Sequence, residues 1–203
     1  NCFHAFDDIA KFLVVFIGVP FAIHYLNLKL KTAADIEEKL QIPFLGEIRK
    51  FPRKIKNLHQ LVLRQADPQG VEIFRQLHSQ ILLKNKSYRK GHTYVVTSAL
   101  PKEGKSFFAI NLAASFSRHH YRTLLVDCDF RRPTIGTRLS DELRSDLHPE
   151  VEEGKPVQLT EELDVLPFAN SIGEATELIE SDGFKKAIAG YQREYDIVII
   201  DTP

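Results

Sequence analysis

The sequence predicts an α/β protein in which helices flank a parallel β-sheet. Two apolar stretches rich in β-branched residues, 93–98 and 122–127, enclose a helix expected over residues 105–119. A strand, a helix and a second strand in this order form a crossover unit, and such units build parallel sheets. A third apolar strand is expected over residues 196–201. The loop after the first strand therefore lies at the sheet edge where α/β proteins bind ligands.

That loop has the spacing of a phosphate-binding loop, [GA]-x-x-x-x-G-K-[ST]. A glycine at position 104 lets backbone amides approach an anion, Lys105 adds a positive charge at a helix start, and the Ser106 hydroxyl can ligate Mg²⁺. The loop departs from the general motif at its first position, where alanine replaces glycine, and a solvated lysine at a helix start is the alternative interpretation. The expected nucleotide-binding residues are Ala99, Leu100, Pro101, Lys102, Glu103, Gly104, Lys105, Ser106 and Phe107.

Carboxylates end the other two strands. Asp127 and Asp129 lie at i and i+2 after one buried-looking strand, and Asp201 ends the last one. Because Mg²⁺ prefers oxygen ligands, carboxylates at the same sheet edge as a phosphate loop are what a Mg²⁺–nucleotide site needs. Arg131, just beyond the double carboxylate, is a candidate phosphate contact or an ordinary surface arginine. The three signals together predict a site for a nucleoside triphosphate.

The composition limits the size of the core and the classes of partner that the chain can have. The chain has 203 residues, 43% of them hydrophobic and 27% charged, which suffices for one ordinary core. The formal net charge of +0 gives no general attraction to nucleic acid, so we expect no nucleic-acid partner. Cys2 and Cys128 are far apart, which indicates neither a disulfide framework nor a zinc site, and Cys128 is expected to be buried. Because the sequence begins with Asn1 and stops just after the third carboxylate strand, we expect a piece of a longer protein.

Residues 9–28 are apolar and long enough, at roughly 30 Å as a helix, to cross a membrane. Pro20 and His24 interrupt the stretch, so a buried helix is an equal alternative. Acidic residues precede it and basic residues follow it, which places the following chain in the cytoplasm if it spans. The expected organisation is a transmembrane helix over 9–28, a juxtamembrane segment and basic linker over 29–66, and the main domain over 67–203.

Within the juxtamembrane segment, Thr32 and Asp35 predict a capping box and a short helix to Leu40. Residues 42–48 are expected to turn into a short edge strand. The basic residues 49–56 follow; they are interpreted as a solvated linker, or alternatively as a contact for anionic lipid.

A helix is predicted from Pro68, with Asp67 as its N-cap. Glu72, Arg75 and His78 share a flank of this helix, either as surface residues with one ion pair or as an intersubunit strip. Downstream we expect a loop over 136–160, a strand over 163–168, a helix over 173–179 and a helix over 182–195 capped by Ser181.

Three motifs, ALPKEGKS, LLVDCDFRRP and EYDIVIIDTP, resemble those of the bacterial tyrosine kinases of the capsular and exopolysaccharide chain-length-determinant family. The resemblance covers about residues 12–203, including LKTAADIEEKLQIPFLGEI and VEIFRQLHSQI. It implies a P-loop NTPase-like fold, ATP and Mg²⁺ as cofactors, and a protein tyrosine, on another copy of the same protein, as phosphate acceptor. It also implies a homo-oligomer at the bacterial inner membrane, with its catalytic domain on the cytoplasmic side, beside the polysaccharide export machinery.

Residue by residue, the resemblance implies that Lys105 binds the β/γ-phosphates and that Ser106 ligates Mg²⁺. Of Asp127 and Asp129, one would lie near the metal and the other would orient or deprotonate the attacking tyrosine, while Asp201 would reach Mg²⁺ through water. The family's oligomerisation strip, Glu-x-x-Arg-x-x-Arg, has His78 at its third place here, and a neutral imidazole weakens such an ion pair near pH 7. The family's terminal tyrosine cluster is absent from this sequence.

The function predicted is an autophosphorylating protein-tyrosine kinase that regulates polysaccharide chain length and export. One rival is an ATP-binding, ring-forming assembly module of an export system, with little or no kinase activity. A weaker one is a partition-type ATPase, against which Leu100 argues because those enzymes carry a signature lysine there.

Overall fold

The computed structural model describes residues 32–52, 55, 57–85, 91–130, 135–139, 155–167 and 180–203. The apolar stretch 9–28, the helix predicted over 173–179 and Arg131 lie outside the described residues. None of the helices in the described part is long and apolar enough to cross a membrane. The chain divides into two units, Asn1–Phe44 and Leu45–Pro203, which are described separately.

In the first unit, helix α3 spans Ala33–Leu40. The predicted capping box is confirmed: the Thr32 side chain accepts from the Asp35 amide, and the Asp35 carboxylate accepts from the Thr32 amide at 3.0 Å. The edge strand predicted over 42–48 is wrong, because no strand forms there. A strand needs a partner for its backbone groups, which local sequence does not supply.

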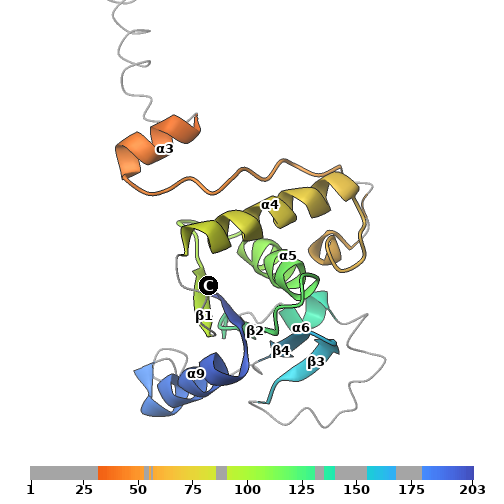
Figure 1. Cartoon of the computed structure of the whole chain (residues 1–203), viewed down its shortest axis with the longest axis vertical. Coiled ribbons are helices and arrows are strands. Elements are labelled where there is room, and N and C mark those ends of the chain that lie inside the picture. Colours follow the sequence, from red (N-terminus) through yellow and green to blue (C-terminus); the bar gives the residue numbers. More distant parts are fainter. Residues whose placement is uncertain are drawn as a thin grey trace, which may run out of the picture. The chain divides into compact units, whose positions relative to one another are not determined.

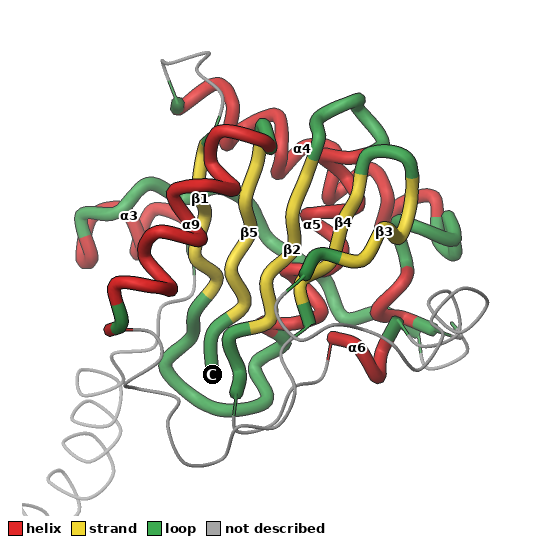
Figure 2. The backbone as a smooth tube through the Cα atoms, turned by 90° about the horizontal axis from the view of Figure 1, so that it is seen from below, coloured by secondary structure: helices red, strands yellow, loops and turns green. Residues whose placement is uncertain are grey.

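The second unit is built on a five-stranded sheet (Figure 2). The strands are β1 (His92–Val96), β2 (Thr123–Asp127), β3 (Val157–Thr160), β4 (Leu163–Leu166) and β5 (Ile197–Asp201). Their order is β1-β5-β2-β4-β3, and only β3 is antiparallel to its neighbour. The predicted parallel sheet is therefore confirmed for four strands.

The loop predicted over 136–160 is wrong at both ends. The short helix α6 spans Ile135–Arg138, and β3 forms an edge strand. Val157 and Leu159 alternate with exposed residues and pack against the core, so this strand has a period-2 pattern, but one too short to stand out in a polar segment.

Helices cover both faces of the sheet (Figures 1 and 2). On one face lie α4 (Pro68–Lys84) and α5 (Lys105–Ser117); on the other lies α9 (Asp182–Glu194). Leu125 of β2 belongs to the core with α4 and α5, whereas its neighbours Leu124 and Val126 pack with α9. Alternate strand residues thus enter two different cores. Asp67 and Ser181 cap α4 and α9 as predicted.

Candidate functional site

The β1–α5 loop occupies the carboxyl edge of the sheet, and α5 begins at Lys105 as predicted. Gly104 precedes it with φ 98°, a left-handed conformation that glycine adopts without strain. A β-carbon at Gly104 would meet no atom within 4 Å, so the backbone conformation, rather than crowding, favours glycine here. The loop thus delivers the helix N-terminus, with the amides of its first turn, to the open edge of the sheet.

Side chains in and beside the loop form hydrogen bonds with one another and with the loop backbone. The Lys105 ammonium donates to the Ser98 hydroxyl at 3.1 Å, and that hydroxyl donates to the Leu100 carbonyl at 2.8 Å. The Leu100 amide in turn donates to the Glu103 carboxylate at 3.1 Å. The Lys105 ammonium is therefore held at Ser98, where the exposed loop 99–104 begins.

Two of the predicted carboxylates lie next to each other. Asp127 and Asp201 are paired in register on β2 and β5 and are 1% and 0% exposed. The Asp127 carboxylate accepts from the Asp129 amide at 3.1 Å and from the Ile135 amide at 3.0 Å. Asp129 itself is half-buried just beyond the strand. The structure therefore brings together the acidic residues that the sequence placed at strand ends.

Of the two carboxylates, Asp201 has the fewer hydrogen bonds from described residues. Neither of its buried carboxylate oxygens has a well-formed hydrogen bond to any described residue. Burial raises the pKa of Asp201 to about 6, and the nearby Ser106 hydroxyl opposes that rise while the Asp127 charge adds to it. A buried carboxylate that lacks a well-formed hydrogen bond among the described residues, beside a second carboxylate and a hydroxyl, is the oxygen set that a hard divalent cation such as Mg²⁺ prefers. The residues present fit that ion.

Cys128 lies between Asp127 and Asp129 in the sequence. It is 3% exposed, so the prediction that it is buried is confirmed. Burial and the charges of Asp127 and Asp201 raise the pKa of its thiol to about 12. A thiol with such a pKa stays protonated at neutral pH and is a poor nucleophile. It acts here as a small apolar residue.

The residue after the phosphate loop, Phe107, is the centre of an aromatic group that sequence reasoning missed. The rings of Phe51, His59 and Phe74 meet it edge-on, with centroids 5.7, 6.1 and 5.7 Å away. Phe51 belongs to the basic run 49–56 that was interpreted as a solvated linker, and His59 follows that run. Phe51, an aromatic residue within a basic run, was the available signal, because a freely solvated linker has little use for one.

The predicted flank of α4 is only partly exposed. Arg75 binds Glu72 through two hydrogen bonds of 2.6 Å, and both side chains are about half exposed. His78 is 4% exposed, and its Nδ1 lies 2.9 Å from the Ser115 hydroxyl of α5. The expectation that all three share a surface strip is wrong for His78. Positions i and i+6 differ by about 120° around a helix, enough to turn the third residue to the inner face.

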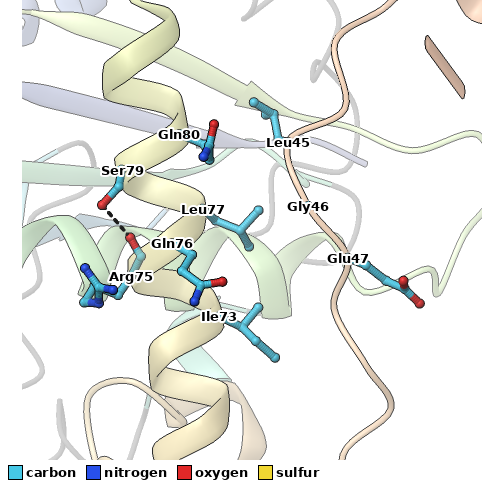
Figure 3. Close-up of a pocket in the computed structure, with 9 residues that line it drawn as sticks. All are labelled: Leu45, Gly46, Glu47, Ile73, Arg75, Gln76, Leu77, Ser79 and Gln80. Carbon is cyan, nitrogen blue, oxygen red and sulfur yellow. Dashed lines mark hydrogen bonds between the residues drawn. The ribbon is translucent and has the colours of Figure 1, made fainter. Parts of the chain in front are cut away.

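A groove lies where residues 45–47 run beside α4 (Figure 3). Its volume is about 270 Å³. Its lining mixes apolar, amide and charged side chains: Leu45, Gly46, Glu47, Ile73, Arg75, Gln76, Leu77, Ser79 and Gln80. The approach is tight, since a β-carbon at Gly46 would lie 2.8 Å from the Leu77 side chain.

Comparison with known proteins assigns the family. No family model matches the chain. The tyrosine-protein kinase Ptk of Acinetobacter johnsonii is 26% identical over 210 residues, which cover 95% of this chain. The tyrosine-protein kinase YwqD of Bacillus subtilis is 33% identical over 150 residues, which cover 70% of it. The crystal structure of the chimerical protein CapA2B2 is 32% identical, covers 85% of this chain and 75% of its own, and superimposes with a TM-score of 0.67.

The chain belongs to the bacterial tyrosine-kinase family. The BceF tyrosine kinase domain, at 24% identity and a TM-score of 0.67, shares the fold. The chain spans 28% of Ptk and 63% of YwqD, so it corresponds to part of these relatives. In this member of the family, the loop 99–106 and the carboxylates at the ends of β2 and β5 form the candidate nucleotide site.

Proposed function

We propose that this chain contributes the ATP-binding part of a protein-tyrosine kinase that phosphorylates itself and regulates capsular or exopolysaccharide chain length and export. The observation that carries the proposal is the buried Asp201, which has no well-formed hydrogen bond among the described residues and lies beside Asp127 at the edge where the phosphate loop starts α5. A buried carboxylate with so few hydrogen-bond donors is unfavourable in the empty protein, and a bound cation would offset that cost.

In the proposed site, Ser106 and Asp127 would hold Mg²⁺ directly, and Asp201 would hold it through water. When bound, Mg²⁺ neutralises phosphate charge and orients the terminal phosphoryl group. Lys105 would leave the Ser98 hydroxyl to contact the β- and γ-phosphates. The backbone amides of residues 99–106 would bind the phosphate oxygens, with Phe107 directly behind them.

The chemistry is transfer of the γ-phosphoryl group to a tyrosine hydroxyl. The bond from the γ-phosphorus to the bridging oxygen breaks, a bond to the tyrosine oxygen forms, and ADP leaves. Asp129, which is half-buried near the loop, or Asp127 would orient the hydroxyl and accept its proton. Positioning and charge neutralisation would supply most of the rate enhancement. A phosphate contact by Arg131 stays a prediction.

The relatives' names support the wider role. The succinoglycan biosynthesis transport protein ExoP of Rhizobium meliloti is 30% identical over 115 residues, 52% of this chain. We propose the bacterial inner membrane as the location, with this part of the protein on the cytoplasmic side, and export machinery as partner. A homo-oligomer through Glu72 and Arg75 is part of the proposal; His78 would act there only through helix packing.

The test is phosphotyrosine mass spectrometry on the full-length protein incubated with Mg·ATP, beside its Lys105→Ala variant. We expect phosphotyrosine in the parent and none in the variant. Lys185→Ala, an exposed substitution on α9, is the control and should behave as the parent. Phosphotyrosine in neither protein, with ATP still bound by the parent, would favour the ring-forming assembly module instead. Retained kinase activity in Lys105→Ala would refute the assignment of the phosphate loop.

A further inference from the structure

Residues 57–66, here called the linker turn, form an ordered element between the basic run and α4. A short 3₁₀ helix, Leu58–Gln60, begins it, and the amide of Ala66 donates to the carbonyl of Leu61 at 2.9 Å. Asn57 and Gln65 adopt left-handed conformations with φ 51° and 49°, which close the turn at both ends. Leu61 is fully buried in the main core. The segment is therefore folded onto the domain rather than solvated.

Asn111 of α5 attaches the linker turn to the helix that starts at the phosphate loop. Its side chain is fully buried, and its carbonyl oxygen accepts from the Val62 amide at 2.9 Å. Its amide group donates to the His59 carbonyl at 3.1 Å and to the Phe107 carbonyl at 2.8 Å. One side chain thus joins the turn to the first turn of α5, next to Ser106. Residues 107 and 111 lie one turn apart in α5, so the linker turn is attached to the helix start that follows the phosphate loop.

Gln60 attaches the linker turn to the other half of the site. Its side chain is 1% exposed, and its amide donates to the carbonyl of Arg138, the last residue of α6, at 2.9 Å. At the start of α6, the Ile135 amide donates to the Asp127 carboxylate at 3.0 Å. Two hydrogen bonds and one turn of helix therefore connect Gln60 with Asp127. No signal in the sequence joined residue 60 to residue 127.

We propose that the linker turn positions the two halves of the nucleotide site, with Gln60 setting the place of the Asp127 carboxylate and Asn111 that of the phosphate-loop helix. This inference rests on the proposed nucleotide site. Both are positioning residues, because each acts through another group. The turn follows the basic run 49–56 directly, so the segment that leads into the domain is hydrogen-bonded to the machinery that would hold Mg·ATP. The proposed role is regulatory. A displacement of the basic run and the linker turn would shift Gln60, and through α6 it would shift the Asp127 carboxylate that is proposed to hold Mg²⁺.

The test compares ADP affinity with and without Mg²⁺ in the full-length protein and its Gln60→Met variant. Methionine keeps the length and apolar contacts of the side chain but can neither donate to the Arg138 carbonyl nor accept from the Arg64 side chain. We expect ADP alone to bind as in the parent, because the phosphate loop is untouched. The gain in affinity from Mg²⁺ should fall about 3- to 10-fold, the effect of one hydrogen bond, because of the two bonds lost only the one to Arg138 leads to Asp127. Gln80→Met, the same change at an exposed position of α4, should leave both affinities unchanged.

Amide hydrogen exchange without nucleotide supplies a second readout. Gln60→Met should speed exchange at residues 135–139 while leaving α9 residues 182–194 as in the parent. Faster exchange throughout the domain, or an equal loss of affinity with and without Mg²⁺, would mean a purely structural role and would overturn the proposal. An unchanged Mg²⁺ effect in a folded variant would overturn it as well. Failure of the parent to bind Mg·ADP at all would instead remove the proposed function on which the inference rests.

Discussion

Asp127 and Asp201 hold matched positions at the carboxyl ends of β2 and β5, yet their surroundings differ. Asp127 receives two backbone amides, whereas Asp201, equally buried, lacks a well-formed hydrogen bond among the described residues. The charge on Asp201 is therefore costly until a cation arrives. That asymmetry indicates which of the two carboxylates limits the stability of the nucleotide-free protein.

Replacing Asp201 with asparagine should stabilise the nucleotide-free protein at pH 7.5 by about 1–3 kcal/mol, since one pKa unit corresponds to about 1.4 kcal/mol. The native pKa of about 6 lies above the ordinary 3.8, so the folded state binds more protons between those values and stability falls as pH rises. The advantage of the variant should be full above about pH 6 and absent below about pH 4. Urea unfolding without Mg²⁺ measures it; a variant less stable than its parent at pH 7.5 would contradict this account.

Buried histidines should make the protein sensitive to mild acid. Burial, with the nearby His119 ring, lowers the pKa of His78 to about 4, and burial with Arg138 does the same for His59. Because the unfolded chain takes up protons near pH 6.5, stability is full above that pH and is lost as pH falls towards 4. Unfolding at pH 5.5 should take up about one proton less in His78→Gln than in the parent.

Unfolding titrations at several pH values would measure this difference in proton uptake. His120→Asn is the matched control, because residue 120 is exposed and asparagine tolerates its left-handed backbone, φ 65°. An identical pH slope in parent and His78→Gln would show that His78 is not the responsive group.

Tyr195, the C-cap residue of α9, forms a hydrogen bond to β4 that should contribute to stability. Its hydroxyl donates to the Asp164 carboxylate at 2.5 Å, and burial raises the pKa of the phenol above its ordinary value. Tyr195→Phe leaves that carboxylate without this donor, and we expect a loss of about 1.5–3 kcal/mol in the free energy of unfolding. Tyr121→Phe, at a half-buried ring, provides the comparison and should cost less. Equal losses would argue against a specific role for the Tyr195 bond.

Two glycines around α9 should respond in opposite directions to alanine. At Gly91, φ is 81° and a β-carbon would lie 2.1 Å from the Gln192 carbonyl oxygen, so Gly91→Ala should cost more than about 2 kcal/mol. At Gly190, inside the helix, nothing lies within 4 Å, and Gly190→Ala should stabilise by about 0.5–1 kcal/mol. Thermal unfolding of the two variants checks both signs; a stabilising Gly91→Ala would disprove the close approach.

Short stretches of the sequence were enough to predict many of the secondary-structure elements and most of the candidate site residues. The strand, loop and helix around Lys105, the caps at Thr32, Asp67 and Ser181, and the carboxylates at the strand ends were all readable. Each depends on a few neighbouring residues, through a hydrophobic period, a capping oxygen or a glycine, and so it is present in a short window of sequence.

The tertiary structure alone decided the rest. It inserted β5 between β1 and β2, which brings Asp201 beside Asp127, 74 positions earlier in the chain. It also folded the linker turn onto Asn111, turned His78 inward and left residues 42–48 without a strand partner. These outcomes depend on which surfaces meet after the elements have formed. Such long-range packing is a property of the whole chain, and no single window of residues contains it.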